Sequence, residues 1–142
     1  MATDPFDLER FRVAQDSHAT YDDALAELRR GRKTTHWMWF VFPQIAGLGR
    51  SSTAVFFAVR SLDEARAYLA DPVLGARLRE AAEAVEHAPA SSAEALLGGI
   101  DAPKLRSSMT LFARAAPEEA VFRRVLDRWF AGEEDEATLA RI

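Results

Sequence analysis

The sequence has 142 residues, with 18 basic and 22 acidic side chains and a formal net charge of −4. This is the length of one ordinary domain, and the mild acidity gives no general attraction to nucleic acid or to an anionic membrane. The chain has no cysteine, which excludes disulfides, thiol catalysis and cysteine-ligated zinc. The three histidines are far apart in the sequence and form no helical pair, so we predict no metal site and no cofactor.

No apolar run approaches the roughly 20 residues that are needed to cross a bilayer. The first five residues, Met-Ala-Thr-Asp-Pro, contain no apolar signal core. We therefore expect a cytoplasmic protein that has neither a membrane nor a nucleic acid as its partner.

Two helices are expected at the start of the chain. The Asp4-Pro5 pair is typical of a helix start, with the aspartate as N-cap and proline at the first position, and this helix should end near Gln15. A second helix should begin at Thr20, because apolar residues then recur at helical spacing. Gly31 suits its left-handed C-terminal cap.

Residues 36–42 form the most aromatic stretch of the chain, His-Trp-Met-Trp-Phe-Val-Phe. Such a run is typical of a buried segment, but its periodicity does not separate a strand from a short helix. No other segment offers a partner strand, so we predict a short helix that is capped by Thr35 and ends before Pro43. Gly47 and Gly49 then suit a tight loop.

The remaining chain is expected to be helical. Serine followed three residues later by glutamate predicts helix starts at Ser61 and Ser91, and Asp71-Pro72 predicts a long helix to about His87. Further helical segments are expected at residues 54–59, 104–112, from 117 onward and around 138–142. Together these elements predict an all-α fold, a single compact multihelical domain of about seven to eight helices over residues 1–142.

Two segments combine cations, hydroxyls and aromatic rings, at residues 33–50 and 104–112. Ammonium and guanidinium groups bind phosphate or carboxylate, and indole rings can stack on a planar group. If the two segments meet, they would form a pocket for a small anionic ligand. The alternative is that these cations are solvated and that the hydroxyls bond the carbonyls of their own helix. The predicted ligand-binding residues are Lys33, Trp37, Trp39, Gln44, Lys104, Arg106, Ser107 and Ser108.

His36 is the candidate for proton transfer, because an unperturbed imidazole titrates near neutral pH. It would act alone or together with the hydroxyl of Ser107 or Ser108. The alternative is a histidine that only packs beside the two tryptophans. The Gly-x-Ser-x-Gly motif of many serine hydrolases does not occur in the chain, so whether the protein is an enzyme stays open.

Several motifs resemble those of the bacterial domain family of unknown function DUF 1810. They are Asp-Pro-Phe-Asp at 4–7, His-Trp-Met-Trp-Phe at 36–40, Pro-Val-Leu-Gly at 72–75 and Ser-Ser-Met-Thr-Leu-Phe at 107–112. The resemblance follows nearly the whole chain in the same order. It implies a compact multihelical single domain, and it brings no known reaction, cofactor or catalytic residue.

The sequence therefore supports two hypotheses. The first is a soluble domain that binds a small anionic metabolite, similar to a nucleotide or to ADP-ribose, between the 33–50 and 104–112 segments. The second is a protein-interaction module without catalytic activity, which would expose an aromatic patch. The oligomeric state stays open between a monomer and a homo-oligomer.

Overall fold

The computed structural model describes residues 3–142, and within this range every regular element is a helix. The prediction of an all-α fold is confirmed. The helices outnumber the seven to eight expected, because four of them are only four or five residues long. They are α1 (Glu9–Asp16), the 3-10 helix η1 (Ser17–Ala19), α2 (Thr20–Arg30), α3 (Met38–Val41), α4 (Ser52–Phe56), α5 (Leu62–Ala70), α6 (Pro72–Glu86), α7 (Ala93–Leu97), α8 (Ala102–Ala115), α9 (Ala120–Phe130) and α10 (Glu136–Leu139).

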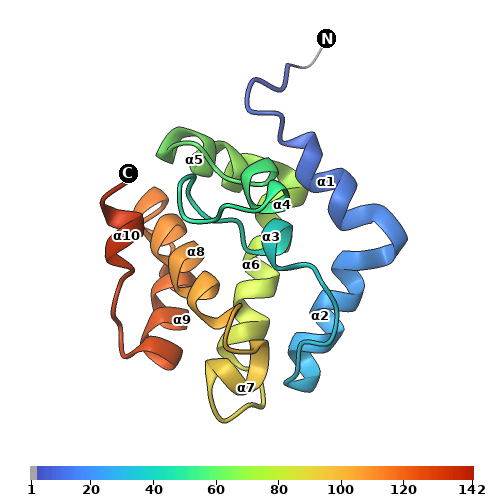
Figure 1. Ribbon diagram of the computed structural model, residues 1–142, viewed down its shortest axis with the longest axis vertical. Helices are drawn as coiled ribbons and strands as arrows, with labels where there is room; N and C mark the ends of the chain where they lie inside the picture. The colour runs from blue at the N-terminus through green and yellow to red at the C-terminus, as the bar shows by residue number, and fades with distance from the viewer. Residues whose placement is uncertain (1–2) are drawn as a thin grey trace.

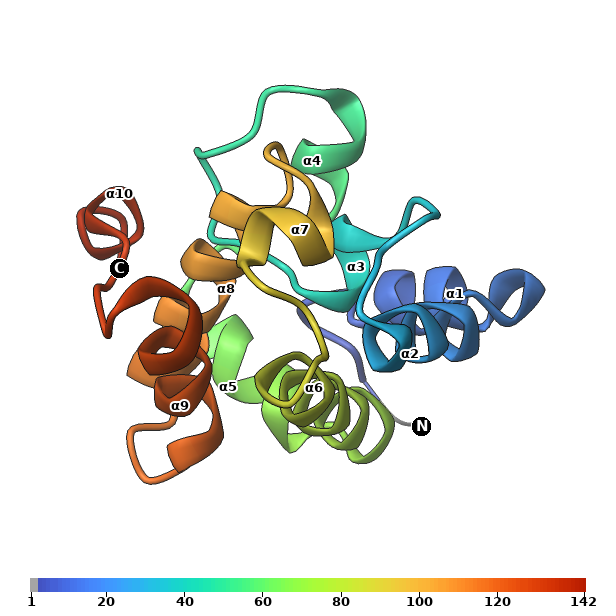
Figure 2. The same ribbon diagram turned by 90° about the horizontal axis from the view of Figure 1, so that it is seen from below.

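The long helix α6 runs through the middle of the molecule (Figure 1). Helices α1 and α2 lie on one side of it, and α8, α9 and α10 lie on the other side, in both views (Figures 1 and 2). Helix α9 packs against both α6 and α8, and α5 packs against α6 and α8. Seen from below, the short helices α3, α4 and α7 lie on a third side of the molecule (Figure 2), with α7 at the opposite end of that side from α4 (Figure 1).

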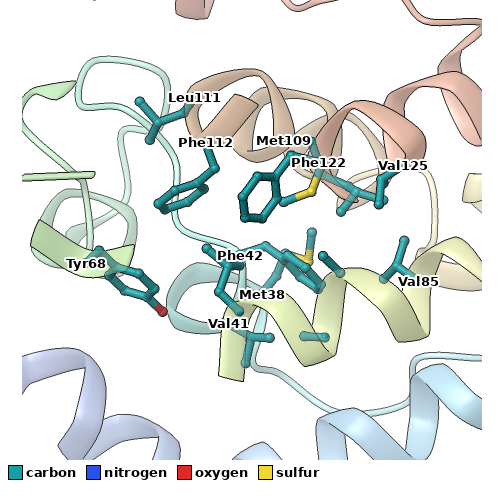
Figure 3. Packing of buried hydrophobic residues seen from close by; sticks show 14 of the residues in the cluster. Met38, Val41, Phe42, Tyr68, Val85, Met109, Leu111, Phe112, Phe122 and Val125 are labelled. Atoms are coloured by element: carbon teal, nitrogen blue, oxygen red, sulfur yellow. The ribbon is translucent and has the colours of Figure 1, made fainter. Parts of the chain in front are cut away.

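One continuous core joins these groups of helices. Figure 3 shows Met38 and Phe42 from the α3 region reaching between α6 and α8, toward Met109 and Phe122. All four side chains are buried. The aromatic stretch at 36–42 thus fills the centre of the molecule, as its density of large apolar side chains predicts.

The aromatic stretch is helical, as predicted, but Thr35 is not its cap. Helix α3 covers Met38–Val41, and its N-cap residue is Trp37, which makes no side-chain capping bond. Just beyond Pro43 the backbone forms a single parallel bridge instead of a strand, between Ile45 and Val59. This bridge gives the extended backbone here the hydrogen-bond partners that a longer sheet would otherwise supply.

The prediction that the first helix starts at Asp4 was wrong by one turn. Helix α1 begins at Glu9, because the Asp4 carboxylate accepts hydrogen bonds from the backbone N–H groups of Leu8 and Glu9 at 2.8 and 2.9 Å. Asp7 has a left-handed φ of 51°, so a turn separates Asp4 from the helix. Aspartate tolerates this conformation better than most residues.

Candidate functional site

The two lysines of the chain meet at one carboxylate. All 16 other basic side chains, apart from the histidines, are arginines. Lys33 Nζ lies 2.9 Å from Asp101 Oδ2, and Lys104 Nζ lies 3.2 Å from Asp101 Oδ1. The Lys33 side chain is only 8% exposed and that of Lys104 is 25% exposed. The predicted segments 33–50 and 104–112 therefore come together, with Asp101 between them.

Each ammonium also lies over an indole ring. Lys33 Nζ is 5.1 Å from the centroid of the Trp37 ring, and Lys104 Nζ is 5.4 Å from that of Trp39. These distances are within the range of cation–π attraction. Trp37 is fully buried, whereas Trp39 is half-buried. The two ammoniums and the one carboxylate leave this cluster with a formal charge of +1, at a position where solvent screens it only in part.

Lys33 is positioned by the end of α2 and by Glu27. Gly31 ends α2 in the left-handed conformation, with φ of 86°. The buried Glu27 carboxylate then accepts hydrogen bonds from Thr34 N, Thr35 N, Thr35 Oγ1 and Trp37 Nε1 at 2.5–3.0 Å. Burial by itself raises the pKa of Glu27, but the hydrogen bonds from Thr35, Thr34 and Trp37 outweigh it and hold the pKa at about 2. The loop that carries Lys33 is therefore folded around a permanent anion.

Asp101 is positioned by the turn that precedes α8. The backbone N–H of Ala102 donates to Gly98 O, those of Lys104 and Leu105 donate to Asp101 O, and Pro103 has no N–H. The first turn of α8 thus keeps none of these amides free for an anion.

Gln44 and His36 differ in their surroundings. Gln44 is half-buried and shares with Trp39 a hollow of about 10 Å³, which is room for one water molecule at most. His36 is exposed. A ligand of the two lysines would therefore lie on the surface over Trp39, within reach of the 33–36 loop.

Arg106 and Ser107 face a different part of the molecule. The Arg106 guanidinium donates to the backbone oxygens of Glu133 and Glu134 at 3.0 and 2.7 Å. Ser107 Oγ donates to Asp135 Oδ2 at 3.0 Å, and this same carboxylate caps α10. In the structure these two side chains hold the C-terminal segment against α8 and do not join the lysine cluster.

Ser108 is the third hydroxyl-bearing candidate, and it is completely buried. Its Oγ has no hydrogen-bond partner among residues 3–142. A serine in a helix can satisfy its hydroxyl by donating to a carbonyl one turn earlier. Ser108 lies away from solvent.

Sequence reasoning missed Asp101 and Glu27, the two carboxylates that organise the site. Neither of them belongs to a motif that identifies a carboxylate as a lysine partner. The signal that was available is the use of lysine at only two positions in a chain with 16 arginines. That restriction singles out Lys33 and Lys104 without any knowledge of the fold.

Among residues 3–142 there is no cluster of three or more histidine, aspartate or glutamate side chains that could hold a metal ion. In the same range, no helix is both long enough and apolar enough to span a membrane.

The fold and the two distinctive segments define a helical domain of a known family. The family model described as "Protein of unknown function (DUF1810)" matches residues 5–142, and the chain belongs to this family. It is similar to the crystal structure of the conserved hypothetical protein Rv1873 from Mycobacterium tuberculosis, with 48% sequence identity and a TM-score of 0.93. The likeness covers 96% of each chain. No curated protein matches the sequence.

Proposed function

We propose that the protein binds a small anionic ligand on the surface formed by Lys33, Lys104 and Trp39. The observation that carries the proposal is the convergence of both lysines of the chain on Asp101, next to two indoles. The second ammonium leaves a net positive charge, which favours an anion.

The choice of lysine over arginine supports this proposal. An ammonium group is a compact charge with three donors that it can redirect, whereas a guanidinium holds a fixed planar fork. Lys33 Nζ already donates to the carbonyl oxygen of Thr35 at 2.6 Å, besides its pair with Asp101. It would exchange one of these acceptors for a ligand oxygen without moving its backbone.

The half-buried indole of Trp39 suggests a ligand that has a planar part. A base or a similar ring would stack on the exposed portion of the indole, while its phosphate or carboxylate group reaches Lys104. A nucleotide or an ADP-ribose-like compound has both parts. The exposed imidazole of His36 would be the group that moves a proton if the bound ligand reacts.

The proposal is tested by titrating the protein with inorganic pyrophosphate and with ADP in a calorimeter. We expect Lys104→Met to weaken binding by about 10-fold or more, because a charge-assisted hydrogen bond contributes about 1.5–3 kcal/mol. Asp101→Asn should strengthen the binding of both probes, because it removes the carboxylate that competes with them. Arg123→Gln is the matched control, since it removes one positive charge from α9, outside the cluster.

The outcome that contradicts the proposal is equal binding, or equal absence of binding, in the wild type, Lys104→Met and Arg123→Gln. Circular dichroism of each variant establishes that it is folded. A gain in affinity in Asp101→Asn cannot result from misfolding, so this variant keeps the test decisive even if the substitutions lower stability.

The alternative function is an interaction module that exposes the 36–42 aromatic patch, of which Trp39 is half-buried. Trp37, Met38, Phe40, Val41 and Phe42 are all buried. An interaction surface in this stretch would therefore have to use Trp39 together with side chains from other segments.

A further inference from the structure

The largest exposed apolar side chains that lie close together are on α1 and α4. Val13 is 61% exposed, Val55 is 62% exposed and Phe56 is 57% exposed. Removing an aromatic ring from water is favourable, so a phenylalanine that stays exposed in this way is a candidate contact residue. We refer to Val13, Val55 and Phe56 as the Phe56 ridge.

Phe56 borders two hollows, whose walls also share Asp7 and Arg10. One of them has a volume of about 420 Å³ and is lined by Glu9, Val13 and Phe57 among others. The other has a volume of about 320 Å³ and is lined by Phe6, Val55 and Arg60 among others. Both hollows include Phe56 in their walls. The exposed ring of Phe56 therefore borders two recesses, and the volume of each exceeds that of a phenylalanine side chain.

The backbone under the ridge is held firmly in place. The Arg10 guanidinium donates to Phe56 O and to Ala58 O, both at 2.9 Å, and pairs with the buried carboxylate of Glu64 at 2.8 Å. The ring of Phe57 packs on Phe56 in an edge arrangement, with ring centroids 4.8 Å apart. A side chain whose position is fixed before binding loses little conformational entropy when a partner covers it.

Charged side chains of both signs line the two hollows beside the Phe56 ridge. The Glu9 side chain lines one hollow and the Arg60 side chain lines the other, and both residues are exposed. Neither side chain forms an ion pair within residues 3–142, whereas Arg10 is neutralised by Glu64. Asp7, which is also exposed and forms no ion pair within residues 3–142, lines both hollows. The surroundings of Phe56 thus carry one unpaired cation, Arg60, and two unpaired carboxylates, Glu9 and Asp7.

We propose that the Phe56 ridge is the contact surface of a homodimer with two-fold symmetry. A two-fold interface brings a surface against itself, so it must be self-complementary. Rotation about an axis beside Phe56 places the ring of one copy in a hollow of the other. The same rotation brings Arg60 of one copy toward Glu9 of the partner subunit. Both the shape and the charge of this surface meet the requirement, and a second copy is therefore the partner that it fits.

Sedimentation equilibrium of the full chain tests the proposal. We expect a dimer in the wild type, and a rise in the dimer dissociation constant of about 30-fold or more in Phe56→Ser, since aromatic residues at the centre of an interface are its main contributors. Ile100→Ser is the matched control, because Ile100 is 80% exposed, lies on the loop before α8 and has no place in the ridge. It should dimerise like the wild type.

Charge reversal gives a second test. Its positive result is the association of two variants with each other, which misfolding would not produce. Arg60→Glu and Glu9→Arg should each weaken the homodimer, because like charges then face each other, and a mixture of the two variants should form a heterodimer. A wild type that stays monomeric at 0.5 mM protein, roughly the range in which weak dimers form, overturns the proposal and leaves the ridge to another partner. A dimer that Phe56→Ser does not weaken, or variants whose mixture does not associate, overturn it as well.

Discussion

Glu27 shows how a single buried side chain positions a functional loop. Its carboxylate binds the N–H groups of Thr34 and Thr35 and the indole N–H of Trp37. These donors belong to the segment between α2 and α3, which has no regular secondary structure to hold it. A carboxylate in the core replaces that secondary structure, and Lys33 takes its position from it.

We expect Glu27→Gln to destabilise the fold by about 2–4 kcal/mol at pH 7, because hydrogen bonds to a charged group are stronger than those to an amide and the amide NH₂ faces other donors. The loss should also depend on pH. The pKa of Glu27 is about 2 in the folded protein, compared with about 4.3 in an unfolded chain. The ionised carboxylate therefore stabilises the fold above about pH 4.3, and this contribution is lost as the pH falls toward 2.

Urea denaturation at pH 6 and at pH 3 measures this effect. Over this interval the wild type should lose about 2 kcal/mol that Glu27→Gln does not lose. Asp23→Asn is the control, since it removes the same charge from an exposed position in the first turn of α2, and it should change stability by less than about 1 kcal/mol. Parallel pH profiles for the wild type and Glu27→Gln would show that the carboxylate has no such role.

At the residue scale, part of the candidate site could be predicted from the sequence. The clustering of cations and aromatics marked Lys33, Trp39 and Lys104, and the structure brings these three side chains together around Asp101. Arg106 was assigned to the same site on composition alone. Its neighbour in space is a segment nearly 30 residues away, and a sequence pattern does not specify which of several acceptors a long side chain reaches.

At the scale of elements, helix starts were predictable where a cap acts locally. Ser61 Oγ accepts the N–H of Glu64 at 3.1 Å, as expected of a serine three residues before a glutamate. Asp71 caps α6 in the same way. Thr35 has the same capping chemistry, yet its hydroxyl donates to Glu27 at 2.5 Å. A buried carboxylate from another element competes for such a side chain, and the competition appears only after the chain has folded.

The junction between α5 and α6 depends on a close approach at Gly75. A Cβ on Gly75 would lie 2.1 Å from the backbone oxygen of Leu69, far inside the contact distance. Alanine normally stabilises a helix by about 1 kcal/mol relative to glycine. Here we expect Gly75→Ala to destabilise the protein by about 1–3 kcal/mol, because the two helices must move apart.

The sign of this effect, measured by urea denaturation, is the test. Ala76→Gly at the next, exposed position of α6 gives the helix-propensity contribution by itself and should cost about 1 kcal/mol. If Gly75→Ala proved more stable than the wild type, the close packing of α5 on α6 would be disproved.

For the molecule as a whole, the all-α class followed from the absence of any alternating apolar pattern that could pair with residues 36–42. The arrangement of the helices around α6 could not be predicted from the sequence, because it depends on which apolar helix faces pack together. Figure 3 shows the result, with side chains from α3, α5, α6, α8 and α9 in one core. Such contacts join segments that lie far apart in the chain, and helical periodicity describes each helix only by itself.

A single core predicts that the whole molecule unfolds in one cooperative step. Phe112 lies between Tyr68 and Phe122, at centroid distances of 5.5 and 5.9 Å, and so joins α5 to α9 through α8. In the Trp129→Phe protein, the remaining fluorescence comes from Trp37 and Trp39 around α3, whereas far-UV circular dichroism follows all helices. We expect the two urea midpoints to coincide. Phe112→Ala in this background should lower both midpoints equally and reduce the free energy of unfolding by about 3–5 kcal/mol. Phe112 lies on a different helix from the two reporters. A fluorescence midpoint that stays in place while the dichroism midpoint moves would mean that α8 and α9 unfold separately from the α3 region.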